Sequence, residues 1–238
     1  MIGTLLNIAT VIVGGGLGTW LGDRLPAPIR ETVMHGIGLV TLVVGVHLTL
    51  ETRNILIVLL SVVLGGILGE WWGIAAALDR ASQWVQGRAA GLLGVGRLGY
   101  FSEGLVTASL VFCVGPMTIL GAIQDGLSGN IELLSIKSVL DGFTAMALAS
   151  TLGVGVLFSV ITLLLYQGGI TMLAGVAERA LSEAMIAEMT ATGGVLILAI
   201  GLLLLEIKRT RVANLLPALL LAPLLVALLD ALGIPLAP

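Results

Sequence analysis

Eight long apolar runs constrain the fold of this 238-residue chain more than any other feature of its sequence. A helix of about 20 apolar residues crosses the hydrocarbon core of a bilayer. The runs lie at residues 4–21, 33–50, 55–74, 105–123, 138–152, 156–174, 194–205 and 215–229. Charged residues make up only 11% of the chain, whereas a soluble domain has about 25%. The sequence therefore predicts an all-α, polytopic membrane protein, a bundle of about eight spans in a single transmembrane domain, 1–238.

The fifth and seventh runs are short, and the fifth and sixth could instead form one bent span. The distribution of Lys and Arg favours eight spans with both termini outside. That arrangement places most of the eleven basic residues inside, namely Arg24, Arg30, Arg80, Arg88, Arg97, Lys208, Arg209 and Arg211, and leaves Arg53, Lys137 and Arg179 outside. The fused alternative divides them six against five, which fits the positive-inside rule less well.

Segment 79–97 is too polar to span a membrane. Its apolar and basic residues recur at helical spacing, so we expect a helix on the inner membrane surface.

Two glycine-rich stretches resemble each other closely: GGGLGTWLG at 14–22 and GGILGEWWG at 65–73. Glycines four residues apart form one smooth helix face, against which another backbone can approach closely. These faces comprise Gly14, Gly18 and Gly22 in the first span and Gly65, Gly69 and Gly73 in the third. They fit internal packing, and they equally permit a homo-oligomer.

The glycine stretches belong to longer repeats. Residues 38–47 (GLVTLVVGVH) resemble residues 104–115 (GLVTASLVFCVG), so spans one and two and spans three and four form two similar hairpins within 1–124. A fainter third hairpin and a final span occupy 153–238, after a polar loop and a linking span at 125–152. Five crossings separate the first and sixth spans, so the third hairpin is expected to be inverted, as in secondary transporters.

No Asp, Glu, Lys or Arg lies clearly at the centre of a predicted span, which argues against a proton pump. Motifs for hydrolysis, phosphate binding or metal binding are absent from the sequence. We therefore expect no enzyme activity, no cofactor and no metal site, and the small net charge of −3 gives no reason to expect a nucleic-acid partner.

The stretch 115–155 contains the polar features that could form a site. Gly115-Pro116 should break the fourth span, because proline lacks an N–H and clashes with the preceding turn. The candidate substrate or pathway residues are Gln124, Asp125, Lys137, Ser138, Asp141 and Gln167. Lys137 and Asp141, four apart on a helix, are a capping pair at the membrane surface, or they converge with Gln124 and Asp125 at an outer vestibule that selects a polar or charged solute. Gln167 must find a partner or water, since an amide in hydrocarbon is costly.

Three segments carry a family resemblance: MIGTLLNIATVIVGGGLGTWLG, FCVGPMTILGAIQDGL and KSVLDGFTAMALASTLGVGVLFSVITLLLYQG. They resemble the YqgA/YdfK-like family of bacterial inner-membrane proteins, over residues 1 to about 229. The family is a domain of unknown function, often described as a membrane or transport protein. The resemblance implies a multi-span protein of the bacterial inner membrane and supplies no substrate or functional residue.

The function that fits best is secondary transport or channelling of a small polar solute or ion across the lipid bilayer. The alternative is a non-transporting membrane scaffold or assembly protein that binds helices through its glycine faces.

Overall fold

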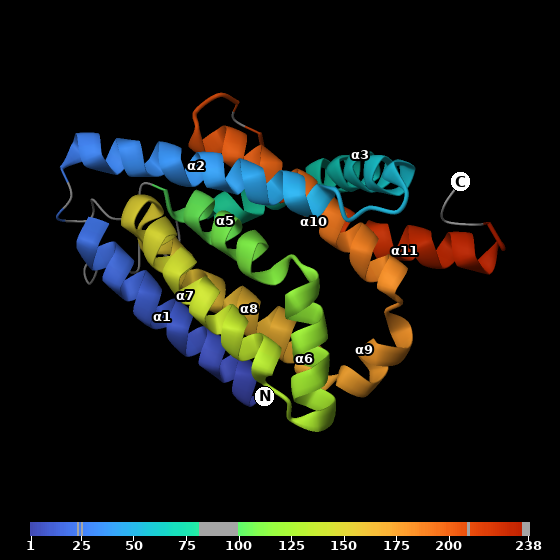
Figure 1. Ribbon diagram of the computed structural model, residues 1–238. Helices are drawn as coiled ribbons and strands as arrows, with labels where there is room; N and C mark the ends of the chain where they lie inside the picture. The colour runs from blue at the N-terminus through green and yellow to red at the C-terminus, as the bar shows by residue number, and fades with distance from the viewer. Residues whose placement is uncertain (23, 25, 81–99, 209, 235–238) are drawn as a thin grey trace. The chain divides into compact units, whose positions relative to one another are not determined.

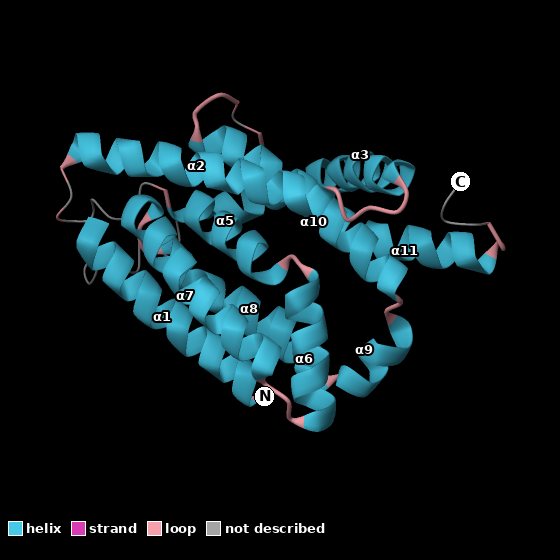
Figure 2. Cartoon of the chain, in the orientation of Figure 1, coloured by secondary structure: helices cyan, strands magenta, loops and turns pink. Residues whose placement is uncertain are grey.

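The computed structural model describes residues 1–22, 24, 26–80, 100–208 and 210–234, and these residues are almost entirely helical. No strand occurs in these ranges (Figure 2). The predicted surface helix at 79–97 falls almost wholly outside them. The helices include α1 (Ile2–Gly22), α2 (Ala27–Thr49), α3 (Ile55–Trp72), α5 (Phe101–Cys113), α6 (Pro116–Ser128), α7 (Glu132–Leu152), α8 (Gly155–Met172), α9 (Ala174–Ala180), α10 (Glu183–Leu204), the 3-10 helix η2 (Val212–Leu215) and α11 (Ala218–Ala231). The all-α prediction is confirmed.

Seven helical segments in the described residues are long and apolar enough to cross a membrane, and the bent pair α5–α6 would be the eighth. The expected break at Gly115-Pro116 is present: Gly115 has φ 133°, a conformation open to glycine. The two helices meet at 62°. Thr118 Oγ1 donates to the Phe112 carbonyl at 3.0 Å, so a side chain bonds a carbonyl at the break.

Two helices begin earlier in the structure than the spans predicted from the sequence. The fifth was expected at 138–152 and the seventh at 194–205, but α7 begins at Glu132 and α10 at Glu183. The hydropathy of the sequence excluded the charged first turns of these two helices. In the structure, polar side chains accept hydrogen bonds from backbone N–H groups of both first turns. Asn130 Oδ1 accepts from Glu132 N, and Ser182 Oγ accepts from Met185 N. The fifth and sixth spans are separate helices, parted at Gly153, so the fused alternative is wrong.

The chain divides into two compact units. Unit 1 contains residues 1–37, 76–113 and 117–175, and its helices include α1, α5, α6, α7 and α8. Unit 2 contains residues 38–75, 114–116 and 176–238, and it includes α3, α10 and α11 with residues 38–49 of α2. The second sequence hairpin therefore contributes one span mainly to each unit, whereas α2 of the first hairpin is divided between them.

In unit 1 the glycine face of α1 packs on the backbone of α7, and the two helices lie side by side (Figure 1). A Cβ added to any of these glycines would collide with a carbonyl group of α7. The pairs are Gly14 with Gly142, Gly18 with Met146 and Gly22 with Ser150. The residue numbers of the contacting pairs rise together in both helices, so α1 and α7 run in the same direction.

This direction bears on the number of spans. Two parallel membrane helices must be separated along the chain by an odd number of crossings, and α2 and α3 supply two. The third crossing comes from the pair α5–α6, because this pair lies along the whole length of α8. The contacts are Gly155 with Phe101, Thr162 with Ser109, and Gly126 with Thr171. The contacts therefore indicate that α5–α6 is a broken span that crosses completely, which makes eight.

In unit 2 the second glycine face packs on the last span. A Cβ on Gly65 would meet Ala218, and one on Gly69 would meet the Asn214 carbonyl. Gly73 does not belong to this face: it ends α3 with φ 65°, and its position has open space around it. The third glycine of this stretch is therefore a helix cap rather than a packing residue.

Candidate functional site

A continuous chain of polar side chains crosses the interior of unit 1, joining α7, α1 and α8. Its members are Lys137 and Asp141 on α7, Asn7 and Thr4 on α1, and Gln167 and Thr171 on α8, and all are buried. In a membrane-spanning bundle, buried polar groups must find partners among themselves. Their hydrogen bonds show how they do so.

The charged end of this chain is an ion pair in the middle of a helix. Lys137 Nζ lies 2.5 Å from Asp141 Oδ2, and both side chains are less than a tenth exposed. Asp141 is the tenth residue of the 21-residue α7, because that helix begins six residues earlier than predicted. The pair therefore does not cap a helix at the membrane surface, and the expectation that no ionisable residue lies centrally in a span is wrong.

Asn7 connects the ion pair to the neutral part of the chain. Its Nδ2 donates to Asp141 Oδ2 at 2.9 Å and to Gln167 Oε1 at 3.1 Å. Gln167 Nε2 donates to Thr4 Oγ1 at 3.1 Å, and Thr4 Oγ1 lies 3.2 Å from Thr171 Oγ1. Gln167 has thus found the partners that its burial demands.

One acceptor of Asn7 is left over. The residue is 0% exposed, yet its Oδ1 has no hydrogen-bond partner in the described structure. Buried polar atoms without partners are few in folded proteins, and each costs about 1–3 kcal/mol. An unpaired buried oxygen on the amide that bonds to Asp141 marks a place where a further group could bind.

The four residues expected to form one vestibule are placed differently. Asp125 is buried against the start of α1, where it accepts from Gly3 N at 3.1 Å and pairs with the Met1 amino group at 2.9 Å. Gln124 is exposed. Asp141 instead bonds to Asn7, one turn further along α1 than Gly3. The structure thus joins Lys137 to Asp141 and places Asp125 in a separate contact.

The predicted site residue Ser138 and several other hydroxyls of unit 1 bond to their own helices, as serine and threonine often do. Ser138 Oγ donates to the Leu134 carbonyl at 2.6 Å, and Ser159 Oγ to the Val156 carbonyl at 2.6 Å. Ser150 and Thr151 form similar bonds three residues back. These hydroxyls are satisfied locally.

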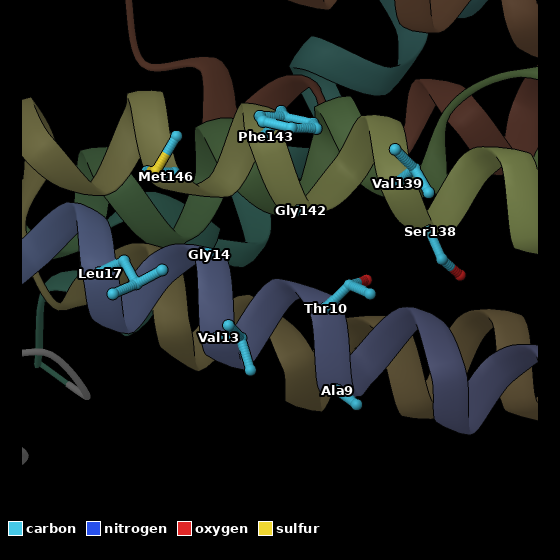
Figure 3. A pocket seen from close by; sticks show the side chains of 10 residues that line it. All are labelled: Ala9, Thr10, Val13, Gly14, Leu17, Ser138, Val139, Gly142, Phe143 and Met146. Carbon is cyan, nitrogen blue, oxygen red and sulfur yellow. The ribbon is translucent and has the colours of Figure 1, made fainter.

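An apolar groove of about 390 Å³ runs between α1 and α7 (Figure 3). Its lining comprises Ala9, Thr10, Val13, Gly14 and Leu17 from α1 and Ser138, Val139, Gly142, Phe143 and Met146 from α7. Thr10, like Ser138, bonds to a carbonyl of its own helix. Phe143 and Val13 are more than half exposed. This groove suits an apolar chain rather than a polar solute.

Unit 2 holds a buried acid that the sequence did not single out. Glu188 on α10 is 1% exposed. Its carboxylate accepts from Thr52 Oγ1 at 2.7 Å and from the backbone N–H groups of Arg53 and Asn54 at 2.6 and 2.9 Å. It therefore fixes the turn between α2 and α3, a structural role for a buried charge.

Thr4, Asn7, Thr171 and Glu188 were not among the residues predicted from the sequence to form a site. For α1 a signal was present: Asn7 lies seven residues, or two turns, before Gly14, on the same helix face as the glycines. For Glu188 there was none, because the seventh span was placed after it.

The helices and this interior define a polytopic α-helical membrane protein with a buried ion pair. The chain belongs to the family described as "Protein of unknown function (DUF554)", whose model matches residues 2–227. It is 30% identical over 239 residues to "Uncharacterized membrane protein YdfK" of Bacillus subtilis (strain 168), covering 98% of this chain and 99% of that protein. It is 34% identical over 226 residues to "Uncharacterized protein YqgA" of Escherichia coli (strain K12), covering 93% and 94%. No solved structure matches. The family resemblance is thus confirmed, together with a multi-pass membrane location.

Proposed function

We propose that this protein moves a small polar solute or ion across the membrane as a secondary transporter or channel. The observation that carries the proposal is the Lys137–Asp141 pair at the middle of α7, continued through Asn7 to α8. Ionisable groups inside membrane spans are costly and commonly mark ion or solute pathways.

Stability alone does not account for such a pair. Replacing a buried ion pair by well-packed apolar residues is often neutral or stabilising. A helix that needed only to pack could carry leucine or alanine at both positions. A role in binding or conduction gives a reason for keeping both charges in a low-dielectric interior.

Two further features support transport. The broken span α5–α6 resembles the discontinuous helices that form midplane sites in many transporters. The predicted inverted repeat would fit the same class. We also propose that the protein resides in the bacterial inner membrane with both termini outside, as the basic residues suggest, and that it is not an enzyme.

The scaffold alternative loses its main argument in this structure. Gly14, Gly18 and Gly22 are covered by α7, and Gly65 and Gly69 by the η2–α11 segment. A partner helix could not use these faces without displacing a span. The open α1–α7 groove remains available for such binding.

The proposal is tested by solute flux into proteoliposomes containing the full-length protein. The solute panel comprises monovalent cations, anions, amino acids and small organic acids. We expect a saturable flux of one class, lost in Asp141→Asn and retained in the control Glu183→Gln, whose carboxylate is 91% exposed. Absence of any protein-dependent flux across the panel would count against transport and favour the scaffold.

A further inference from the structure

The Asn7 amide, whose oxygen is unpaired, belongs to a connected set of oxygen-bearing side chains. Its Nδ2 contacts the Asp141 carboxylate and the Gln167 amide oxygen, and the bonds of 2.9–3.2 Å continue from Gln167 Nε2 to the hydroxyls of Thr4 and Thr171. Carboxylate, amide and hydroxyl oxygens are the ligands of hard cations. The three helices therefore bring together the donor set of a small cation site.

The charge of this set points to a monovalent ion. Asp141 is the one acid among the five residues, and the other four are neutral. Calcium sites have more oxygen ligands and usually several carboxylates. In the described part of the chain, no group of three His, Cys, Asp or Glu could hold a metal ion. One carboxylate balances one positive charge, and in this structure the Lys137 ammonium supplies it.

We propose that Asp141, Asn7, Gln167, Thr4 and Thr171 form a sodium-binding site, and that Lys137 holds the place of the ion in this structure. The inference rests on the proposed function, for which it names the transported or coupling ion. The ammonium and the sodium ion compete for Asp141 Oδ2, because an apolar interior does not hold two cations beside one carboxylate.

Rotation of the Asn7 amide would convert the lysine-paired state of this site into the sodium-bound state. With Lys137 on Asp141, Nδ2 donates to Asp141 and Gln167 and Oδ1 is left unpaired. A half-turn about χ2 would place Oδ1 where Nδ2 now lies, about 3 Å from Asp141 Oδ2 and Gln167 Oε1. Three oxygens that close together repel one another unless a cation lies between them.

The competition predicts how Lys137 affects affinity. If the lysine occupies the carboxylate in roughly nine of ten molecules, the apparent affinity for sodium falls about tenfold. Lys137→Met removes the competitor but leaves the Asp141 charge unbalanced. This variant should unfold at a lower temperature than the wild type without sodium, and sodium should restore its stability.

The experiment follows thermal unfolding of the full-length protein in detergent, in NaCl or in choline chloride at equal ionic strength. We expect a saturable, sodium-specific rise in melting temperature for Lys137→Met, with half-saturation at roughly one tenth of the wild-type sodium concentration. The double variant Lys137→Met/Asp141→Asn should show no sodium-specific response. Glu183→Gln serves as the control and should behave as the wild type.

Equal melting temperatures of Lys137→Met in the two salts would overturn the inference. If that variant cannot be purified, ²²Na⁺ binding to the wild type decides: saturable binding that Asp141→Asn abolishes supports the site, and its absence overturns it. Failure here is distinct from failure of transport. Solute flux that is independent of sodium would support the proposed transport function without a sodium site. Sodium binding without any flux would support the sodium site and contradict transport.

Discussion

Asn7 joins three helices through one side chain, from α1 to Asp141 on α7 and Gln167 on α8. An amide is suited to this place because its two N–H groups reach two acceptors at once. An apolar residue of similar size would leave both acceptors without this donor. The connection between the charged and neutral halves of the site thus depends on a single residue.

Replacing Asn7 by leucine should therefore destabilise the protein by about 1–3 kcal/mol, the cost of leaving buried acceptors unpaired. The measurement is the melting temperature of the purified protein in detergent. Ser159→Ala is the matched control, since its hydroxyl only bonds back to the Val156 carbonyl, and it should be close to neutral. Equal effects of the two substitutions would contradict the role given to Asn7.

Glu188 allows a second test at the residue scale. Its carboxylate accepts from one hydroxyl and two backbone N–H groups. In Glu188→Gln one oxygen becomes an NH₂ group, which cannot accept, so at least one of these three donors loses its acceptor. We expect a loss of about 1–3 kcal/mol, measured as a fall in melting temperature. Glu183→Gln, at an exposed position of the same helix, should leave the melting temperature unchanged.

At the scale of single helices, α1 shows why its glycines are spaced by four. Two parallel backbones approach so closely that a carbonyl of α7 occupies the space of each missing Cβ. Gly16 lies in the same run but has open space around it. The repeated pattern is therefore a packing surface, and the residues on that face need to be glycine.

Gly18→Ala should be strongly destabilising, by about 1–3 kcal/mol or more, because the methyl group would force apart α1 and α7. Gly16→Ala should be neutral or slightly stabilising, since alanine favours the helix by about 0.5–1 kcal/mol. Thermal unfolding of the two variants side by side checks this pair. Similar effects of the two substitutions would contradict the role given to close approach at Gly18.

The sequence predicted these helices well where apolar residues fill a whole span, as in α1 and α3. It failed at α7 and α10, because hydropathy cannot recognise charged residues that are paired inside the bundle. Gln167 and Asp141 could be named in advance as polar groups in apolar runs. Their partners could not, since Asn7 lies 134 residues from Asp141 and 160 from Gln167 along the chain.

At the scale of the whole molecule, the direction of the helices fixes the path of the chain through the bilayer. Parallel contacts of α1 with α7, and of α5–α6 with α8, require the bent pair to cross completely. A reporter inserted after Gly129 should therefore lie on the opposite side from one inserted after Gly73. Cysteine labelling or reporter fusions measure this, and the same side for both would make α5–α6 a re-entrant loop.

The predicted inversion of repeats needs a further fusion. A reporter in the loop at 205–211 should lie on the same side as one after Gly73. If the two lie on opposite sides, the third hairpin would enter the membrane in the same orientation as the first, and the inverted repeat would be excluded.

The pairing of α1 with α7 also has a consequence for biosynthesis. About 110 residues separate the end of α1 from the start of its partner, so the ribosome needs on the order of ten seconds to produce α7 after α1 is complete. During that interval Thr4 and Asn7 have no partner helix, and lipid, the insertion machinery or a chaperone must shelter them. The first segment to be made thus waits for a partner helix that is made much later.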